Sequence, residues 1–207
     1  MSPSKENILK KIRKALSQST PLPFPQSEGS SVFPLATQEL EIEFAEQFTK
    51  LQGKFIFCLN QQELAFQLNS LIRKQGWKRV YCREDNLMNF LDPLSTEALT
   101  NDLATCDISI TGCEVLVART GTIVMSTAQS SGRTVSIYAP IHICIAYSKQ
   151  LVYDIRDALQ LIRARYSDQL PSLISFATGP SRTADIEKTL VVGVHGPKEV
   201  YCFLVDE

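Results

Sequence analysis

The stretch KFIFCLNQQELAFQLNSLIRKQGWKRVYC, residues 54–82, decides the fold class of this 207-residue chain. It opens with KFIFCL and closes with RVYC, two apolar runs that are typical of strands. Leucine and isoleucine recur at helical spacing between them, NQQE at 60–63 resembles a capping box, and Gly76 is placed to end the helix. A strand, a helix and a strand in this order predict an α/β fold, with a parallel or mixed sheet covered by helices on both faces.

The rest of the chain extends this pattern. Apolar spacing predicts a helix from Thr37 to about Leu51, and residues 104–146, which are β-branched and punctuated by glycine, predict several consecutive short strands. Helical spacing returns over 148–166. The C-terminal third then predicts a strand at 171–179, a last helix over roughly 183–192 and a closing strand at 198–206.

Composition excludes several classes of function. The chain is 44% hydrophobic and 21% charged, and its 21 basic and 22 acidic side chains give a formal net charge of −1. No global positive field is present to attract a polyanion, so nucleic acid is not an expected partner. No apolar run reaches the roughly eighteen residues that a spanning helix needs, and the N-terminus does not resemble a signal peptide. We therefore expect a cytoplasmic protein.

The cysteines and histidines predict no metal or cofactor in this chain. Its six cysteines form no C-x-x-C pair and lie mostly in apolar, strand-like runs. An iron–sulfur cluster or a structural zinc needs several thiolates that converge on one centre. The two histidines, His142 and His195, are too few for a histidine-rich site. We interpret the cysteines as reduced core thiols and His142 as structural.

The N-terminal segment differs from the rest. Residues 5–16 predict a short basic amphipathic helix, which could dock on its own domain, on a partner subunit or, less readily, on a membrane surface. Proline and serine in residues 17–34 predict an extended linker. The predicted organisation is thus an N-terminal helix with its linker over 1–34, followed by an α/β domain over 35–207.

The stretch ATGPSRTADIEKTLVVGVHGP, residues 177–197, is the first candidate site. If a helix starts here, its free N–H groups and the arginine could hold a carboxylate or a phosphate. The same residue types also form an ordinary helix cap. His195 adds a loop imidazole that is able to transfer a proton or contact a ligand. The candidate ligand-binding residues are Gly179, Ser181, Arg182, Thr183, Asp185, Glu187 and His195.

The stretch ITGCEVLVARTGTIV, residues 110–124, is the second candidate. It contains two Thr-Gly pairs, which could lie at the mouth of a pocket or form turns between strands. Neither pair matches a P-loop or a dinucleotide fingerprint, and no nucleophile elbow is present. No catalytic residue is therefore assigned. The candidates from this stretch are Gly112, Glu114, Thr120, Gly121 and Thr122.

Together, ITGCEVLVARTGTIVMST, GRTVSIYAPIHICIA, QLVYDIRDAL and TGPSRTADIEKTLVVGVHGPKEVYCFLVD resemble the LUD-domain proteins of the lactate utilisation protein C (LutC/YkgG) type. The resemblance is close over about 100–207 and looser before that. It implies a three-layer α/β/α fold with a mixed, largely parallel sheet, similar to the NagB/RpiA/CoA-transferase superfamily. It also favours a binding site over a simple helix cap at 177–197.

The same resemblance implies two functional hypotheses. In the first, the chain is the cluster-free subunit of an assembly that oxidises L-lactate to pyruvate, and iron–sulfur clusters belong to its partner proteins. In the second, it is a stand-alone enzyme or sensor for a small anionic metabolite, such as a phosphorylated, CoA-like or folate-like compound. A carboxylate or other anion is the expected ligand in both, and a homo-oligomer is possible. Catalysis by the chain alone is left open.

Overall fold

The computed structural model describes residues 3–16, 36–91, 99–167, 169–184 and 190–207. The chain divides into two units, Met1–Leu35 and Ala36–Glu207. In the first unit, Pro3–Leu16 form the helix α1, which matches the predicted basic amphipathic helix. All elements described next belong to the second unit, which contains every core cluster of the described chain.

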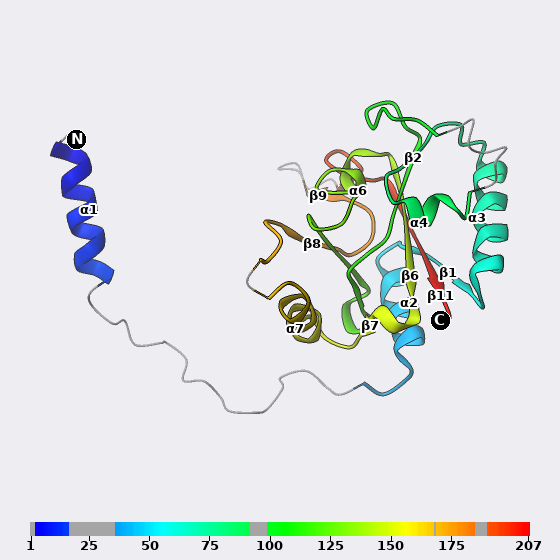
Figure 1. The fold of residues 1–207 in the computed structure, drawn as a ribbon, viewed down its shortest axis with the longest axis horizontal. Coiled ribbons are helices and arrows are strands. Elements are labelled where there is room, and N and C mark those ends of the chain that lie inside the picture. The colour runs from blue at the N-terminus through cyan, green and yellow to red at the C-terminus, as the bar shows by residue number, and fades with distance from the viewer. Residues whose placement is uncertain (1–2, 17–35, 92–98, 168, 185–189) are drawn as a thin grey trace. The chain divides into compact units, whose positions relative to one another are not determined.

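A five-stranded parallel sheet, sheet A, organises the second unit (Figure 1). Its strand order is β1-β11-β6-β3-β2, and every neighbouring pair is parallel. The strands are β1 (Lys54–Cys58), β2 (Val80–Cys82), β3 (Ile108–Thr111), β6 (Ile141–Tyr147) and β11 (Glu199–Val205). The two longest, β6 and β11, lie side by side at the centre and are buried along most of their length.

The stretch at 54–82 forms the predicted strand, helix and strand as β1, α3 (Gln61–Gln75) and β2. The Asn60 side chain accepts the Glu63 N–H at 2.9 Å and caps the start of α3. Gly76 ends the helix in the left-handed conformation, with φ of 69°. The local signals thus determine both ends of α3, as predicted.

Helices cover both faces of sheet A. On one face, α3 and the short α4 (Asp85–Met88) pack in a core around Leu64, Leu68, Ile143 and Phe203. On the other, α2 (Leu40–Lys50) buries Phe44 and Phe48 in a second core. These layers confirm the α/β fold and the largely parallel sheet.

A second, mixed sheet continues the layer that contains α2. Sheet B has the order β7-β4-β5-β8, in which only β7 and β4 are parallel. It packs against sheet A through the second core and against α7 on its outer face. The elements are β4 (Val115–Val117), η1 (Ala118–Thr120), β5 (Thr122–Ser126), η2 (Ser148–Gln150), β7 (Leu151–Val152), α7 (Ile155–Tyr166) and β8 (Ile174–Ala177).

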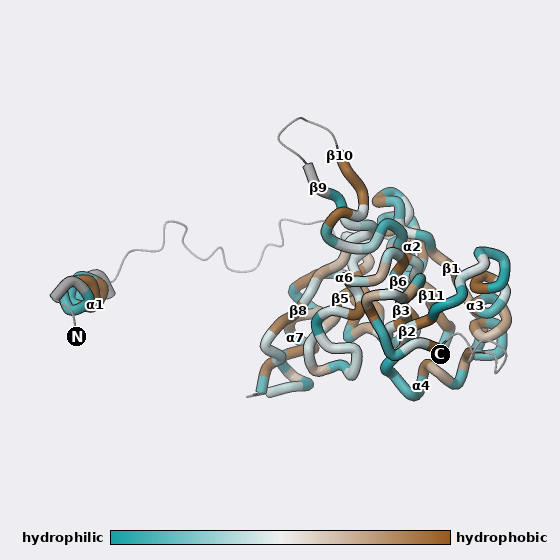
Figure 2. The backbone as a smooth tube through the Cα atoms, turned by 90° about the horizontal axis from the view of Figure 1, so that it is seen from above, coloured by the Kyte–Doolittle hydropathy of each residue, from teal (hydrophilic) through white to brown (hydrophobic). Residues whose placement is uncertain are grey.

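The helix predicted over 183–192 is wrong. Arg182–Ala184 form β9 and Leu190–Val192 form β10, and the two strands pair antiparallel. Figure 2 shows them side by side, projecting from the remainder of the second unit. Val191 and Val192 favour extended backbone, and Gly193, with φ of 78°, donates its N–H to the Ser181 carbonyl. Residues 185–189 lie outside the described chain.

Two smaller predictions also differ from the structure. The predicted run of strands over 104–146 is interrupted by a short helix, α6 (Val135–Tyr138), whose Val135 packs in a small core with Tyr81. The helix predicted over 148–166 starts only at Ile155, because residues 151 and 152 join sheet B as β7. Of the described helices, none is long and apolar enough to cross a membrane.

Candidate functional site

The carboxyl ends of β2, β3 and β6 surround a cleft of about 370 Å³, called here the carboxyl-edge cleft. The chain leaves β2 toward α4 on one face of sheet A and leaves β3 toward sheet B on the other. Such a divergence of connections is where open α/β sheets bind ligands. The polar and charged residues that line the cleft are Glu84, Asn86, Glu114, Tyr147, Lys149, Gln150 and Arg165.

Glu84 is held in place on one side of this cleft. Its Oε1 accepts the Gly112 N–H at 3.1 Å and the Ser131 hydroxyl at 2.5 Å. A Cβ at Gly112 would lie only 2.9 Å from Glu84 Oε2, so the absence of a side chain lets backbone and carboxylate meet. Both hydrogen bonds from the described residues go to Oε1. Oε2 is therefore available to a ligand.

Glu114 forms the charged floor of the cleft and is 2% exposed. Its carboxylate accepts the hydroxyls of Ser126 at 2.6 Å and Tyr166 at 2.7 Å, and it forms an ion pair with Arg165 from α7. A buried carboxylate is stable only with such partners. Burial raises the pKa of Tyr166, and its bond to Glu114 raises that pKa further, so the phenol remains a proton donor at neutral pH.

Two cations border the cleft. The Arg165 side chain is 49% exposed, so guanidinium donors beyond the one used by Glu114 face solvent. Lys149 lies at the carboxyl end of β6 with its Nζ 5.2 Å from the centre of the Tyr147 ring, a cation–π contact. Burial, and then the nearby Glu207, raise the pKa of the Tyr147 phenol. The arginine and lysine can bind a small anion, and the carboxylate of Glu84, fixed in position beside them, can accept a proton from it.

The residues predicted at 177–197 contribute to a different pocket, called here the loop pocket, of about 280 Å³. Gly179, Ser181 and His195 line it together with His142. The Ser181 N–H donates to the Pro197 carbonyl at 2.9 Å, which fixes one loop against the other. This pocket lies near the amino ends of β6 and β11, whereas the carboxyl-edge cleft lies at the opposite ends.

His142 is satisfied in the interior, as predicted. Its Nε2 lies 2.8 Å from the Thr111 hydroxyl, and only 1% of the residue is exposed. Burial lowers the pKa of His142 to about 4, because the protein interior disfavours the charged imidazolium. The imidazole is therefore neutral at physiological pH.

Arg182 and the turn at 120–122 have structural partners. The Arg182 guanidinium donates to the Leu51 carbonyl at 2.6 Å. Gly121 has φ of 58° and lies so close to α2 that an added Cβ would be 2.4 Å from the Phe48 nitrogen. Thr122 bridges the hydroxyls of Thr120 at 2.7 Å and Thr178 at 3.0 Å. These contacts give the residues a structural role in the packing of sheet B and its loops.

Three of the predicted candidates remain without side-chain description. Asp185 and Glu187 lie outside the described residues, and for Thr183 only the backbone, in β9, is described. The first candidate site rested on a helix start at this position. Because Arg182–Ala184 form β9, these described residues do not begin the helix that was proposed to hold an anion there.

The sequence reasoning did identify Gly112 and Glu114, which line the carboxyl-edge cleft, but it missed their partners. Glu84 lies two residues after the end of the short strand β2, a position where a ligand-binding residue could have been sought. Arg165 and Tyr166 are the last residues of α7. The polar pattern of this helix does not indicate a contact with Glu114, which lies 51 and 52 residues earlier in the chain. Among the described residues, no group of three or more His, Cys, Asp or Glu side chains is placed to hold a metal ion.

Comparison with known proteins places these residues in a family context. The family model of the LUD domain matches residues 77–205, which include the whole lining of the carboxyl-edge cleft. In structure, the chain is similar to a duf162 family protein from Deinococcus radiodurans, with a TM-score of 0.63 and 20% sequence identity. That match covers 83% of this chain and 99% of the other, and at this identity it shows the fold alone.

Several curated relatives carry the name Lactate utilization protein C. Those from Bacillus licheniformis and Bacillus subtilis are 36% and 37% identical over 103 residues, which is 49% of this chain and 43% of each relative. The one from Halalkalibacterium halodurans is 36% identical over 118 residues, 56% of this chain and 51% of the relative. The chain thus spans about half the length of these relatives.

Proposed function

The chain belongs to the LUD-domain family, and on this basis we propose that it acts in lactate utilisation by binding the carboxylate of L-lactate in the carboxyl-edge cleft. The observation that carries the proposal is the pairing of a pinned carboxylate, Glu84, with an exposed guanidinium, Arg165, in one cleft. The relatives named Lactate utilization protein C support the choice of lactate. The chain would be the cluster-free member of its assembly.

In this proposal, Arg165 and Lys149 hold the lactate carboxylate. The free Oε2 of Glu84 accepts the proton of the 2-hydroxyl group. Oxidation to pyruvate also removes the hydrogen on carbon 2 as a hydride equivalent, which is two electrons and a second proton. The second proton and the two electrons would pass to the partner proteins. Iron–sulfur partner proteins are the proposed electron acceptors, because one-electron carriers of this class can take the two electrons in succession.

The first test of this function is a tagged pull-down of the full chain from its own cells grown on lactate. Mass spectrometry identifies the partners, and reduction of a dye with L-lactate measures activity. Iron–sulfur partners and activity together support the proposal. An assembly that oxidises lactate undiminished without this chain overturns it.

A matched pair of variants then tests the site. Arg165→Gln is expected to abolish most of the activity, whereas Arg182→Gln, which removes another exposed arginine, is expected to keep it. Arg165 also neutralises Glu114, so the double variant Arg165→Gln, Glu114→Gln separates a binding defect from a folding defect. Full activity in a well-folded double variant would exclude this cleft as the lactate site.

A second function, binding of a larger anionic metabolite by the chain alone, is favoured by the size of the cleft. Its volume of about 370 Å³ falls in the range of sites for ligands larger than a three-carbon acid. Thermal unfolding of the isolated chain with L-lactate, D-lactate, pyruvate and phosphorylated, CoA-like and folate-like compounds distinguishes the two. A ligand that binds only the folded state raises the Tm. A rise with one larger compound and none with lactate favours this second function.

A further inference from the structure

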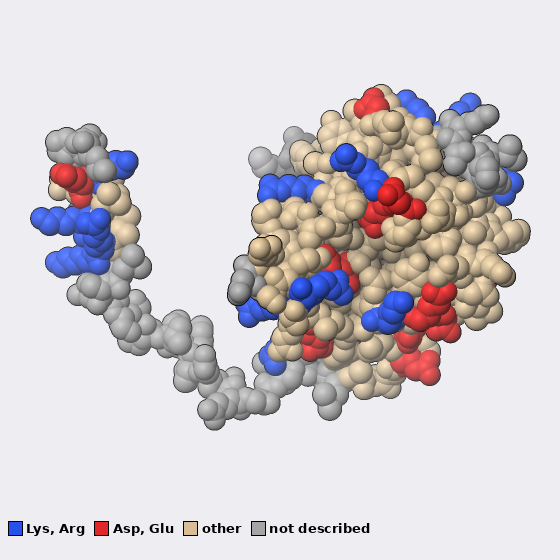
Figure 3. Space-filling model, viewed as in Figure 1, with Lys and Arg blue, Asp and Glu red and all other residues tan. Residues whose placement is uncertain are grey.

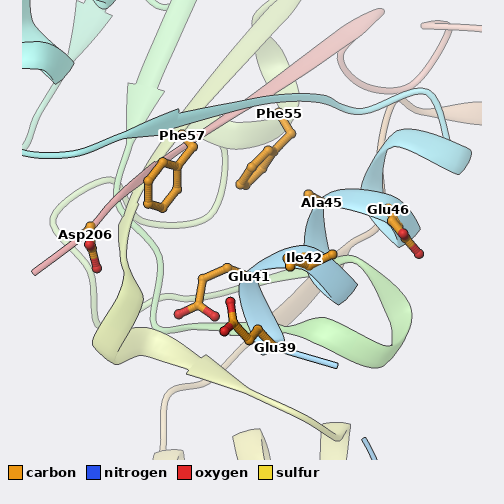
Figure 4. Close-up of a pocket in the computed structure, with 8 residues that line it drawn as sticks. All are labelled: Glu39, Glu41, Ile42, Ala45, Glu46, Phe55, Phe57 and Asp206. Atoms are coloured by element: carbon orange, nitrogen blue, oxygen red, sulfur yellow. The ribbon is translucent and has the colours of Figure 1, made fainter. Parts of the chain in front are cut away.

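An apolar groove with an acidic rim lies along the edge of sheet A, away from both pockets described above. Figure 4 shows Phe55 and Phe57 of β1 facing Ile42 and Ala45 of α2. The groove, called here the β1 groove, has a volume of about 590 Å³. Its carboxylates are those of Glu39, Glu41, Glu46 and Asp206.

The apolar side chains in this groove are incompletely covered. Phe57 is 40% exposed and Ile42 48% exposed. Among the described strands, β1 pairs only with β11, so its other edge is open. An exposed apolar surface beside an open strand edge is typical of a site that binds another segment of protein.

The helix α1 has the complementary character. Ile8 and Ile12 lie one turn apart and are 55% and 48% exposed, so its apolar face is uncovered in the first unit. Lysine and arginine side chains project from the rest of the helix (Figure 3). Its basic residues are Lys5, Lys10, Lys11, Arg13 and Lys14, against a single acidic residue, Glu6.

The two surfaces match in charge and in polarity. The helix carries a net charge of +4 from its side chains, and the rim of the groove carries four carboxylates. A helix of 14 residues is marginal in water by itself, so α1 gains stability from any surface that covers its apolar face. Two copies of the β1 groove facing each other directly would instead bring like charges together.

We propose that the β1 groove binds α1 from a second copy of this chain, so that two copies exchange their N-terminal helices. The isoleucines of α1 lie against Phe55, Phe57 and Ile42, and Lys10 and Lys11 meet the acidic rim. We infer a second copy as the source of the helix because its second unit can also cover the opposite face of β1. There, a groove of about 560 Å³ leaves Phe66 72% exposed.

Sedimentation velocity of the full chain over a range of concentrations tests the assembly. The wild type is expected to be a dimer. Ile8→Asp with Ile12→Asp should weaken the dimer by about 100-fold or more, because both substitutions place a charge in an apolar contact. Leu170→Asp, which changes another half-exposed apolar residue, serves as the matched control and should leave the dimer intact. A wild type that stays monomeric at every concentration overturns the proposal.

Crosslinking between copies tests the position. A carbodiimide joins lysine amines to carboxylates in direct contact, and mixing ¹⁴N-labelled with ¹⁵N-labelled protein marks each link as within or between copies. Mixed-label links from Lys10 or Lys11 to Glu41 or Asp206 support the proposal. Links found only within one label, or a dimer without links to this rim, overturn it. The charge exchange Lys11→Glu with Glu41→Lys should restore part of the affinity that each single change removes.

Discussion

The backbone N–H of Gly112 donates a 3.1 Å hydrogen bond to Glu84 Oε1 and so joins the ends of two neighbouring parallel strands, β3 and β2. The contact depends on glycine, because a Cβ at position 112 would lie 2.9 Å from the other carboxylate oxygen. The hydrogen bond thereby fixes the position of the Glu84 carboxylate. Among the described residues that line the cleft, Glu84 has the only carboxylate with an oxygen available for a ligand.

Gly112→Ala should therefore move Glu84 without unfolding the protein. The ligand for this test is the anion that raises the Tm of the wild type. We expect the variant to bind it roughly tenfold or more weakly, while the free energy of unfolding changes by less than about 1 kcal/mol. Isothermal titration of wild type, Gly112→Ala and Ser131→Ala measures the effect. Ser131→Ala removes the other donor to Glu84 without adding bulk, and should cost less. Unchanged binding in Gly112→Ala would contradict this role of Glu84.

Arg165→Ala should destabilise the fold through Glu114. The variant leaves a buried carboxylate with its hydroxyl partners and no cation, at a cost of about 2 kcal/mol in the free energy of unfolding. For a chain of this size this corresponds to a fall in Tm of roughly 4–8 °C. Arg163→Ala on the same helix is the control, because its side chain is exposed and makes no described ion pair. Adding Glu114→Gln to Arg165→Ala should recover part of the loss.

His142 should make stability depend on pH between about 6.5 and 4. Its pKa is about 4 in the folded protein and 6.5 as an ordinary histidine. As the pH falls through this window the unfolded state binds a proton that the folded state does not, so stability is complete above pH 6.5 and declines below it. The full contribution is about 3 kcal/mol. Urea unfolding of wild type and His142→Gln at several pH values measures it, and the variant should lose this slope.

The variant His195→Gln serves as the control for that series, since His195 is a loop residue that lines the same loop pocket. It should retain the slope that His142→Gln loses. Equal slopes in wild type and His142→Gln would show that the buried imidazole does not govern acid sensitivity above pH 4.

Gly121→Ala should destabilise the protein far more than Gly76→Ala, although both glycines have positive φ. An added Cβ at 121 meets the backbone of α2 at 2.4 Å, whereas position 76 has no atom within 4 Å. We expect a loss of about 3 kcal/mol or more for the first and about 1 kcal/mol for the second. Differential scanning calorimetry of both variants checks the order, and equal losses would rule out the close approach to α2.

Local signals explain why much of the fold was predictable. Asn60 and Gly76 act on residues within one turn of themselves, so the ends of α3 follow from the sequence alone. The prediction of a last helix was wrong because β9 and β10 form by pairing with each other, as between Thr183 and Val191. Strand pairing of this kind depends on a partner in space, and propensity at a helix start does not reveal it.

The candidate site was predictable only in part, for a related reason. Gly112 and Glu114 stand in a glycine-punctuated stretch that already suggested a pocket. Glu84 lies in an unremarkable stretch between β2 and α4, and Arg165 on an amphipathic helix with other exposed arginines. Their importance comes from the partners that the fold brings to them.

The sequence by itself determined the α/β class, both ends of α3, the basic amphipathic character of α1 and the family of the chain. Each of these depends on residues close together in the chain or on a pattern along it. Only the tertiary structure decided that Glu84 and Arg165 border one cleft, and that Arg182 and Gly121 support packing. The physical reason is that hydrogen bonds, ion pairs and close packing join residues by distance in space, which strand order and the packing of the two sheets establish.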